Sequence, residues 1–349
     1  PWERLAAEQT TDLAELERQH AANERAAHRV VGLVVETRPD AVTPEALAEL
    51  RRLGCTKVQI GVQSLDERTL SLNARCLSPA RIAEAFALLR LFGFKIHAHF
   101  MANLLGATPA ADKRDYRRLV ADPAFLPDEV KLYPCALVDG TGLMAHYRDG
   151  SWRPYTEEEL LDVLVEDAAA TPPYTRISRM IRDISSHDIV AGNKKVNLRQ
   201  LVERRAEEAG VRFEEIRTRE IGTDGADVGA LALSVVAYET AVASERFLQW
   251  TAPDGRIAAF LRLSLPFPSC VDDLRERFAD FPIGPGEAMI REVHVYGAVA
   301  GLHRTSAGAQ HLGLGKRLIE AASSIARWVP VSSQAIPRPK SSTFSLPCS

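Results

Sequence analysis

The sequence predicts an α/β fold in two dissimilar halves, and three observations lead to this expectation. Over residues 30–133, four apolar strand-like runs alternate with segments that start with helix N-terminal signals. From about residue 228 the pattern changes to strand-like runs around turn residues such as Asp254-Gly255, which favours antiparallel hairpins. The chain has 349 residues, of which 46% are hydrophobic and 26% are charged, and this suits two or three globular domains.

The first half contains four expected strands, and helix signals separate them. Thr43-Pro44 and Ser78-Pro79 each place an N-capping side chain before a proline at the first helical position. Alternation of this kind favours parallel strands joined by right-handed crossovers, as in a barrel or an open doubly wound sheet. The expected strands are 30–36, which we expect to be buried on both faces, 57–62, 95–101 and 129–133, and the expected helices include 5–28, 112–121 and 151–172.

The ends of these strands carry polar side chains. In parallel α/β sheets, ligands bind at the carboxyl ends of the strands. His97 and His99 share one face of the third strand, but no third metal ligand stands near them, so hydrogen-bonded histidines are favoured over a zinc site. The residues near strand ends that could contact a ligand are Glu36, Arg38, Gln63, Ser64 and His99.

Residues 310–316, QHLGLGK, form the sharpest local motif. They follow 291–297, REVHVYG, an alternating strand in which His294 and the valines face opposite ways, and they open an amphipathic helix over about 314–328. Glycines let the backbone approach a ligand, and N–H groups at a helix N-terminus bind an anion. GNAT acetyltransferases hold the pyrophosphate of coenzyme A in this way, and the alternative is a Gly-rich turn without a ligand.

Basic side chains concentrate in residues 174–222, whereas the whole chain has a net charge of -3. A nucleic-acid surface would therefore be a local patch. Between Arg176 and Arg199 six basic residues accompany two acidic ones, but between Glu203 and Glu220 five arginines accompany six glutamates. We interpret the stretch as a linker whose first half binds phosphates, with a solvated helix face as the alternative.

Cysteine spacing and hydropathy exclude several classes of protein. None of the five cysteines lies within four residues of another, which excludes CxxC zinc sites and local iron–sulfur motifs, and scattered cysteines fit a cytoplasmic protein. No run approaches the roughly 20 apolar residues of a membrane span. Residues 331–349 form a Ser/Pro-rich tail, which we expect to be disordered or read out of frame.

Ten stretches, taken in order, resemble the catalytic subunit of the Elongator complex and its stand-alone bacterial and archaeal relatives. The stretches are VETRPD (35–40), GCTKVQIGVQS (54–64), GFKIHAHFM (93–101), EVKLYP (129–134), GTGL (140–143), RDI (182–184), NLR (197–199), RTREIG (217–222), REVHVYG (291–297) and QHLGLGKRLIEAA (310–322). The resemblance implies a partial radical-SAM barrel joined to a GNAT domain. That family makes 5-carboxymethyl-type modifications at the wobble uridine of tRNA, using acetyl-CoA, S-adenosylmethionine and a [4Fe–4S] cluster.

The resemblance also assigns residues to three sites. The S-adenosylmethionine site would include Glu36, Arg38, Gln59, Gln63, Ser64, His97, His99 and Lys131. Acetyl-CoA would be bound by Val293, His294, Val295, Gln310, His311, Leu312, Gly313, Leu314, Gly315 and Lys316. The phosphates of tRNA would be contacted by Arg176, Arg179, Arg182, Lys194, Lys195, Arg199, Arg217 and Arg219.

Two departures from the family pattern bear on the expected activity. The family carries a cluster-binding cysteine triad upstream of VETRPD, which this sequence does not contain, so no metal ligand is assigned. The C-terminal tail also lacks the paired tyrosines that end a GNAT domain. We therefore expect a fragment truncated at both ends, with a partial radical-SAM domain over 1–173, a basic linker over 174–225, a partial GNAT domain over 226–330 and the tail over 331–349.

The expected activity is modification of C5 of the wobble uridine of tRNA. Two alternatives stay open. A GNAT domain alone would permit a protein lysine acetyltransferase of the histone-modifying type. The missing cysteine triad favours a catalytically inactive tRNA-binding fragment. Self-association is also left open by the sequence.

Overall fold

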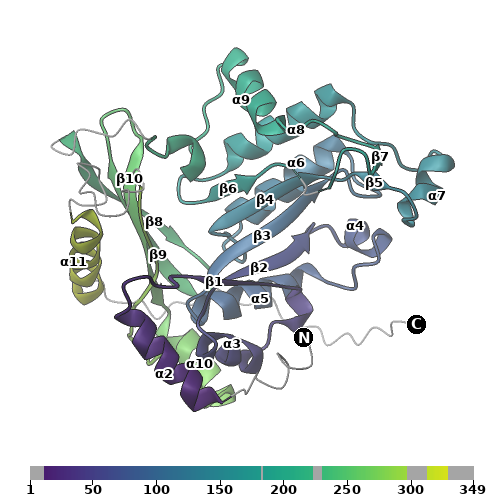
Figure 1. Cartoon of the computed structure of the whole chain (residues 1–349). Coiled ribbons are helices and arrows are strands. Elements are labelled where there is room, and N and C mark those ends of the chain that lie inside the picture. The colour runs from purple at the N-terminus through teal and green to yellow at the C-terminus, as the bar shows by residue number, and fades with distance from the viewer. Residues whose placement is uncertain (1–11, 182–183, 223–229, 297–312, 329–349) are drawn as a thin grey trace.

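The computed structural model describes residues 12–181, 184–222, 230–296 and 313–328. In these ranges the chain forms a five-stranded sheet, a four-stranded sheet and a small two-stranded sheet, and the two large sheets lie side by side (Figure 1). The expectation of a parallel first half and a hairpin-built second half is confirmed. The predicted site residues that lie outside the described residues are Arg182, Gln310, His311 and Leu312, and the tail 331–349 lies there too.

The five-stranded sheet is parallel throughout, in the order β1-β2-β3-β4-β6. Its register places Gln59 beside His97, and His99 beside Lys131, so residues predicted for one site are neighbours across the strands. The strands are β1 (Leu33–Thr37), β2 (Cys55–Gln63), β3 (Lys95–Ala102), β4 (Glu129–Pro134) and β6 (Arg176–Arg179).

Capping residues set where the connecting helices begin. The side chains of Thr43 and Ser78 accept backbone N–H bonds at the starts of α3 and α5, as predicted. Thr156 and Glu159 form a capping box, so α8 begins after Thr156 and not at the expected residue 151. The helices are α2 (Leu13–Glu24), α3 (Pro44–Arg52), α4 (Glu67–Leu72), α5 (Pro79–Leu91), α6 (Pro109–Ala121), α7 (Leu143–Arg148), α8 (Glu157–Ala170) and α9 (Leu198–Glu208), with 3-10 turns η1 (Pro39–Ala41) and η2 (Ile216–Arg219).

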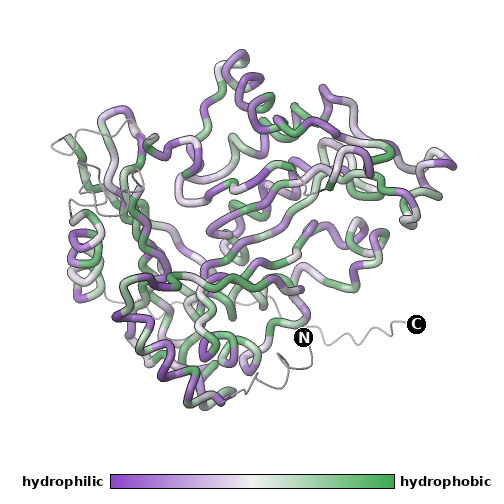
Figure 2. Tube along the Cα trace, viewed as in Figure 1, coloured by the Kyte–Doolittle hydropathy of each residue, from purple (hydrophilic) through white to green (hydrophobic). Residues whose placement is uncertain are grey.

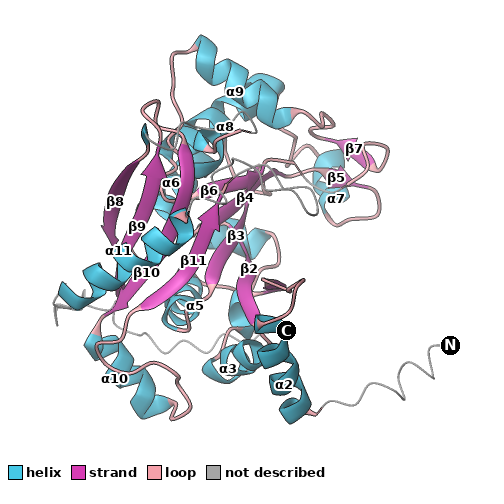
Figure 3. Cartoon of the chain, turned by 60° about the vertical axis from the view of Figure 1, so that its left-hand side comes forward, coloured by secondary structure: helices cyan, strands magenta, loops and turns pink. Residues whose placement is uncertain are grey.

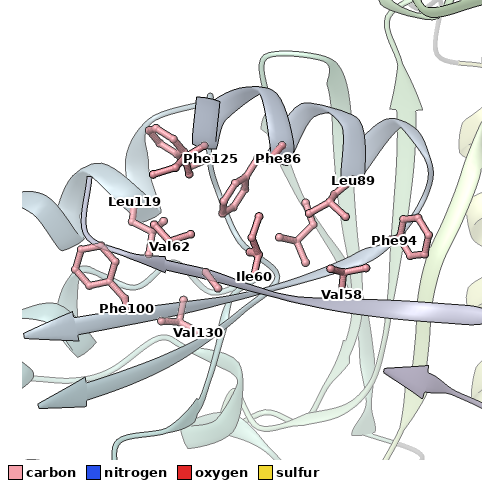
Figure 4. Close-up of a cluster of buried hydrophobic side chains, with 14 of the residues drawn as sticks. Val58, Ile60, Val62, Phe86, Leu89, Phe94, Phe100, Leu119, Phe125 and Val130 are labelled. Carbon is pink, nitrogen blue, oxygen red and sulfur yellow. The ribbon is translucent and has the colours of Figure 1, made fainter. Parts of the chain in front are cut away.

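The main hydrophobic core lies between one face of the parallel sheet and its helices. Val58, Ile60 and Val62 of β2 point toward Phe86 and Leu89 of α5, and all five are almost inaccessible to solvent (Figure 4). Because side chains alternate along a strand, the residues between them point to the opposite face of the sheet, and these are polar or glycine. One face therefore builds the core and the other is available for a site.

Two expectations about this half are corrected. The first strand begins at Leu33 rather than residue 30, and it is mostly exposed rather than buried on both faces, because β1 stands at the edge of the sheet in the described part of the chain. The stretch 174–225, expected as a linker, contains β6, which is the fifth strand of the sheet, and α9. The buried Ile177 and Val202 hold these elements in place, although basic residues surround them in the sequence.

The four-stranded sheet is antiparallel, in the order β11-β10-β9-β8. The hairpin predicted at Asp254-Gly255 joins β9 to β10, and Gly255 there has a φ of +86°. Leu314 and Leu318 of α11 pack with Leu261 on one face of this sheet. The elements are β8 (Ala232–Glu239), β9 (Ala243–Thr251), β10 (Ile257–Pro266), α10 (Pro268–Arg277), β11 (Met289–Val295) and α11 (Leu314–Trp328).

The two halves share one core. Val271 and Leu274 of α10 belong to the cluster that also contains the core of the parallel sheet. The ring of Phe281 lies 5.0 Å from that of Phe92, which follows α5, measured between ring centroids. The second half is thus packed against the first through buried apolar contacts as well as polar ones.

Hydrophilic residues predominate along α2 and α9, while the strands of both large sheets carry more apolar residues (Figure 2). The remaining strands, β5 (Leu137–Val138) and β7 (Ile189–Ala191), pair to form the small sheet. None of the helices in the described ranges is long and apolar enough to cross a bilayer.

Candidate functional site

A pocket opens where β1 and β2 end. Its cavity volume is about 390 Å³, which is in the range of sites for small ligands. Glu36 and Arg38 lie at the end of β1 and Gln63 at the end of β2, so three residues predicted for S-adenosylmethionine meet here. The pocket is lined by Glu36, Thr37, Arg38, Ala41, Gly61, Gln63 and Arg75.

The floor of this pocket has an unusual backbone. Gln63 has a φ of +70°, a conformation that residues with side chains rarely adopt. A Cβ atom at Gly61 would lie 3.2 Å from both Arg75 Nη2 and Gln63 Nε2, so glycine keeps the floor open. Arg75 donates a hydrogen bond to the carbonyl oxygen of Gly61. Arg75 is not among the predicted site residues, because it lies between α4 and α5 and no local motif marks it.

Gln59 contacts two other predicted residues on the polar face of the sheet, and one of these leads to a third. Its Oε1 accepts hydrogen bonds from His99 Nε2, at 2.9 Å, and from Lys131 Nζ. Because an amide oxygen only accepts, a neutral His99 carries its proton on Nε2. The other ring nitrogen, Nδ1, lies 3.5 Å from Glu36 Oε1. These four side chains form a network from the pocket to the middle of the sheet.

His97 lies deeper on the same face. Its Nε2 lies 2.8 Å from Ser178 Oγ, and the hydroxyl of Ser178 donates to the carbonyl oxygen of Val130. Since that hydroxyl proton is used, the neutral ring donates from Nε2, and its bare Nδ1 faces Glu129 Oε2 at 3.4 Å. Burial lowers the pKa of His97 to about 2, although Glu129 opposes this. The hydrogen-bonded histidines favoured by the sequence are confirmed.

Ser64 is turned away from the pocket. Its Oγ lies 2.6 Å from Asp115 Oδ2, to which it donates, and it accepts a bond from the backbone N–H of Asp66. Asp115 stands on α6, so the hydroxyl ties the end of β2 to a helix. The predicted contact of Ser64 with S-adenosylmethionine stays a prediction, because the fold already uses this hydroxyl.

Strand β11 and the start of α11 bring together the described part of the predicted acetyl-CoA site. A Cβ atom on Gly315 would lie 3.5 Å from Val295 Cγ2 and 4.0 Å from Val293 Cγ1, so the first turn of the helix packs directly on the strand. Gly313, just before the helix, has a φ of +69°. The N-terminus of a helix thus stands over the strand that the sequence predicts for the same ligand.

The other described members of this predicted site divide between the core and the surface. Leu314 is buried, whereas Lys316 is exposed and lies 3.8 Å from Glu320. His294 faces the side of the sheet opposite the valines, where its ring stacks on Phe260 with the centroids 5.6 Å apart. Burial lowers the pKa of His294.

The predicted tRNA-binding residues fall into two groups. Arg176 Nε lies 2.6 Å from Glu220 Oε1, and Arg199 Nη1 lies 3.2 Å from the buried Glu215, so these two arginines hold the fold together. The other described residues of the predicted tRNA site are exposed or half-buried. The exposed ones are Lys194, Lys195 and Arg217, and the half-buried ones are Arg179 and Arg219.

Comparisons with known proteins agree on one group. The Radical SAM superfamily matches residues 3–118, and the Radical SAM C-terminal domain matches residues 127–208. A tRNA uridine(34) acetyltransferase of Dehalococcoides mccartyi is 35% identical over 319 residues, which cover 89% of this chain and 67% of the relative. The solved archaeal Elp3 of Methanocaldococcus infernus, with an N-terminal deletion, superimposes with a TM-score of 0.79 at 33% identity, covering 89% of this chain and 73% of that one. This chain belongs to the Elp3 family of tRNA uridine(34) acetyltransferases.

The Elp3 relatives are longer than this chain. Elongator complex protein 3 of Homo sapiens is 33% identical over 87% of this chain, which spans 55% of that relative. The tRNA uridine(34) acetyltransferase of M. infernus is also 33% identical, and the chain spans 58% of it. The match to the Radical SAM C-terminal domain includes β6 and α9, in agreement with the place of β6 in the parallel sheet.

Membership of the Elp3 family implies an iron–sulfur cluster, S-adenosylmethionine and acetyl-CoA, and the described residues fit these groups unequally. Four cysteines are described, and in the described ranges no three His, Cys, Asp or Glu side chains gather to hold a metal. These residues do not fit a cluster. The pocket beside Gly61 does fit a small polar ligand, because it combines a carboxylate, an amide and guanidinium groups around an open floor.

Proposed function

We propose that this chain is an Elp3-type tRNA acetyltransferase acting on C5 of the wobble uridine, and that β11 and α11 bind its acetyl-CoA. The observation that carries the proposal is the packing of Gly315, in the first turn of α11, on Val293 and Val295. This pairing of strand and helix N-terminus occurs in a chain that also carries a radical-SAM sheet. The names of the relatives, tRNA uridine(34) acetyltransferases, supply the acceptor.

The physics of a helix N-terminus supports binding of coenzyme A at this place. The first N–H groups of α11 have no acceptor inside the helix, and their dipoles attract a pyrophosphate. Gly315 presents no side chain toward the strand, so the two backbones approach closely. In the described part of the sheet β11 is an edge strand, and its outward backbone groups can pair with the amides of the pantetheine arm.

The parallel sheet supports the second ligand. Its helices pack on one face and its other face is polar, which favours a radical-SAM-type barrel over a doubly wound sheet. The carboxylate of Glu36 and the guanidinium of Arg75 stand in one pocket, and they match the ammonium and carboxylate of S-adenosylmethionine. We assign that pocket to the nucleoside ligand. S-adenosylmethionine supplies a deoxyadenosyl group and a sulfonium centre when it is bound.

The proposed domain division follows these two sites. Residues 1–173 form most of the radical-SAM domain, and residues 226–330 form a GNAT-like domain. Residues 174–225 connect them and also supply β6 and the candidate tRNA contacts. Among these, Lys194 and Lys195 are exposed in the segment before α9, where phosphates can reach them.

The test is hydrolysis of acetyl-CoA by the full chain, measured as released thiol. We expect tRNA to stimulate the reaction and histone peptides to leave it unchanged. Gly315→Leu places a side chain against Val293 and Val295 and should abolish acetyl-CoA binding. Gly142→Ala is the control, because a Cβ atom there would meet no atom of the described residues within 4 Å.

Two other outcomes select the alternative functions. Acetylation of histone peptides with no effect of tRNA would identify a protein lysine acetyltransferase. Binding of tRNA without any binding of acetyl-CoA would identify a catalytically inactive tRNA-binding chain. Either result overturns the proposed activity.

A further inference from the structure

A chain of ion pairs runs between the two large sheets at the start of β3. Lys95 Nζ lies 2.7 Å from Glu129 Oε1 on β4 and 2.5 Å from Glu292 Oε1 on β11. Glu129 Oε2 pairs with Lys57 and faces Nδ1 of His97. In Figure 3, β11 is the strand of the antiparallel sheet that runs beside the parallel sheet. Lys95 therefore touches both sheets at once.

A β-bulge in β11 directs two consecutive side chains toward the parallel sheet. The register against β10 skips Arg291, which stands opposite no residue of that strand. Neighbouring residues of a regular strand point to opposite faces, yet here Arg291 pairs with Asp128 and Glu292 with Lys95. The bulge holds β11 at two adjacent points, and Val293 of the proposed acetyl-CoA site follows immediately.

Burying these charged groups costs free energy, and only pairing between opposite charges offsets that cost. The side chains of Lys95, Glu129 and Glu292 are 16%, 6% and 11% exposed. Burial lowers the pKa of Lys95, but the two carboxylates outweigh it and raise the pKa above its ordinary value, so the lysine stays charged. Apolar residues of similar size often stabilise such a position at least as well. A buried lysine between two carboxylates therefore favours a role beyond packing.

We propose that Lys95 is a positioning residue for acetyl-CoA. It joins Glu129, which faces the imidazole of His97, to Glu292, which precedes Val293. It thereby fixes the acetyl-CoA strand against the polar face of the radical-SAM sheet and couples ligand binding on β11 to the environment of His97. This inference rests on the proposed binding of acetyl-CoA by β11 and α11.

The coupling has a defined physical route. A ligand that binds to β11 acts on the carboxylate of Glu292, which Lys95 already contacts. Lys95 also contacts Glu129, so it sets how strongly the charge of Glu129 acts on its other neighbours. Nδ1 of His97 is buried and has no hydrogen-bond partner among the described residues, so it responds to small changes of that charge. The imidazole of His97 should therefore report a change in the ion pairs of Lys95 that begins at β11.

The experiment combines calorimetric titration of acetyl-CoA with NMR of carbon-labelled histidines in the full chain. The chain has nine histidines, and His97→Gln assigns the resonance of interest. In the wild type, acetyl-CoA should shift the His97 resonance. Lys95→Met should weaken acetyl-CoA binding by about tenfold and remove the shift. Lys95→Arg keeps a cation between the two carboxylates and should restore both.

The control is Lys113→Met. Lys113 also bridges two carboxylates, Asp162 and Glu166, at 2.6 and 2.9 Å, and its side chain is 17% exposed. It connects α6 to α8, away from β11. This variant should retain the acetyl-CoA affinity and the His97 shift. If Lys95→Met does not fold, Glu292→Gln breaks the same bridge on the β11 side and should give the same two changes.

The outcomes separate this inference from the function on which it rests. If the wild type does not bind acetyl-CoA, the proposed function fails and the coupling fails with it. If the wild type binds acetyl-CoA but Lys95→Met binds it equally well, the proposed function stands and the positioning role is wrong. Equal losses in Lys95→Met and Lys113→Met would also contradict it, because they would report general destabilisation.

Discussion

The guanidinium of Arg291 on β11 meets the carboxylate of Asp128, one residue before β4, in a two-pronged ion pair that joins the two sheets. Nη1 lies 2.5 Å from Oδ2 and Nη2 lies 2.9 Å from Oδ1, and both side chains are fully buried. Asp128 also accepts the backbone N–H of Ile96, the second residue of β3. Burial raises the pKa of Asp128, but Arg291 and Arg262 outweigh it and hold the pKa far below its ordinary value.

Asp128→Asn should therefore lower the free energy of unfolding by about 3–5 kcal/mol, because it removes the two-pronged partner of a buried arginine. Among the described residues, Arg291 then keeps only Glu245, and Arg262 keeps only Glu292, as a paired carboxylate. Urea denaturation at neutral pH measures the change. Asp162→Asn is the control, since Asp162 pairs with Lys113 but is 67% exposed, and its loss should cost less than about 1 kcal/mol. If both variants lower the free energy of unfolding by a similarly small amount, the Arg291–Asp128 pair does not stabilise the fold as expected. Because the folded pKa of Asp128 is depressed, its contribution is present above about pH 4 and is lost in stronger acid.

Asp167 on α8 has a raised pKa, whereas the pKa of Asp128 is lowered. Oδ1 of Asp167 is buried and finds no hydrogen-bond partner in the described part of the chain, and burial together with the nearby Asp112 raises its pKa well above the ordinary value. Asp167→Asn should raise the free energy of unfolding at pH 7 by about 1 kcal/mol, because it removes the cost of a buried carboxyl. Since the unfolded group titrates near pH 4, that advantage should shrink as the pH falls toward 4. Thermal unfolding at several pH values measures it, and a constant difference would refute the assignment.

Gln63 combines strain with a place in the pocket. Its positive φ costs about 1 kcal/mol or more in a residue with a side chain, and glycine adopts that conformation without penalty. We expect Gln63→Gly to stabilise the chain slightly in urea denaturation while it weakens binding of S-adenosylmethionine. The same change at Ser64, Ser64→Gly, should destabilise the chain, because the bond to Asp115 is lost. A gain of both stability and affinity in Gln63→Gly would argue that its side chain has no ligand role.

The basic stretch should show two kinds of behaviour. Lys194 is exposed, so Lys194→Gln should reduce the slope of tRNA affinity against salt concentration by about one unit and leave stability unchanged. Arg199 bridges Glu215 and the carbonyl oxygen of Ile177, so Arg199→Ala should chiefly lower stability. Filter binding at several salt concentrations and urea denaturation distinguish the two. A stability loss for Lys194→Gln would place that residue in the fold and not on the tRNA surface.

Much of the parallel half could be predicted because its signals are local. Thr43 and Ser78 before prolines mark helix starts, and the apolar runs of β2 and β3 mark buried strands. β6 could not be predicted, because four residues among many arginines carry little periodicity, and their pairing with β4 is a contact between distant parts of the chain. Arg75 could not be predicted as a site residue for a similar reason, since its contact with Gly61 depends on how α4 and α5 are connected.

The sequence by itself determined the family, the alternation of strands and helices over residues 30–133 and the positions of polar residues at strand ends, because these follow from neighbours along the chain. Only the tertiary structure decided which of those residues meet. In the fold, Ser64 donates a hydrogen bond to Asp115, and a bulge directs Arg291 and Glu292 to the other sheet. The side chains that form one network there are Glu36, Gln59, His99 and Lys131. The physical reason is that buried charges must find partners wherever packing brings them, and those partners are remote in sequence.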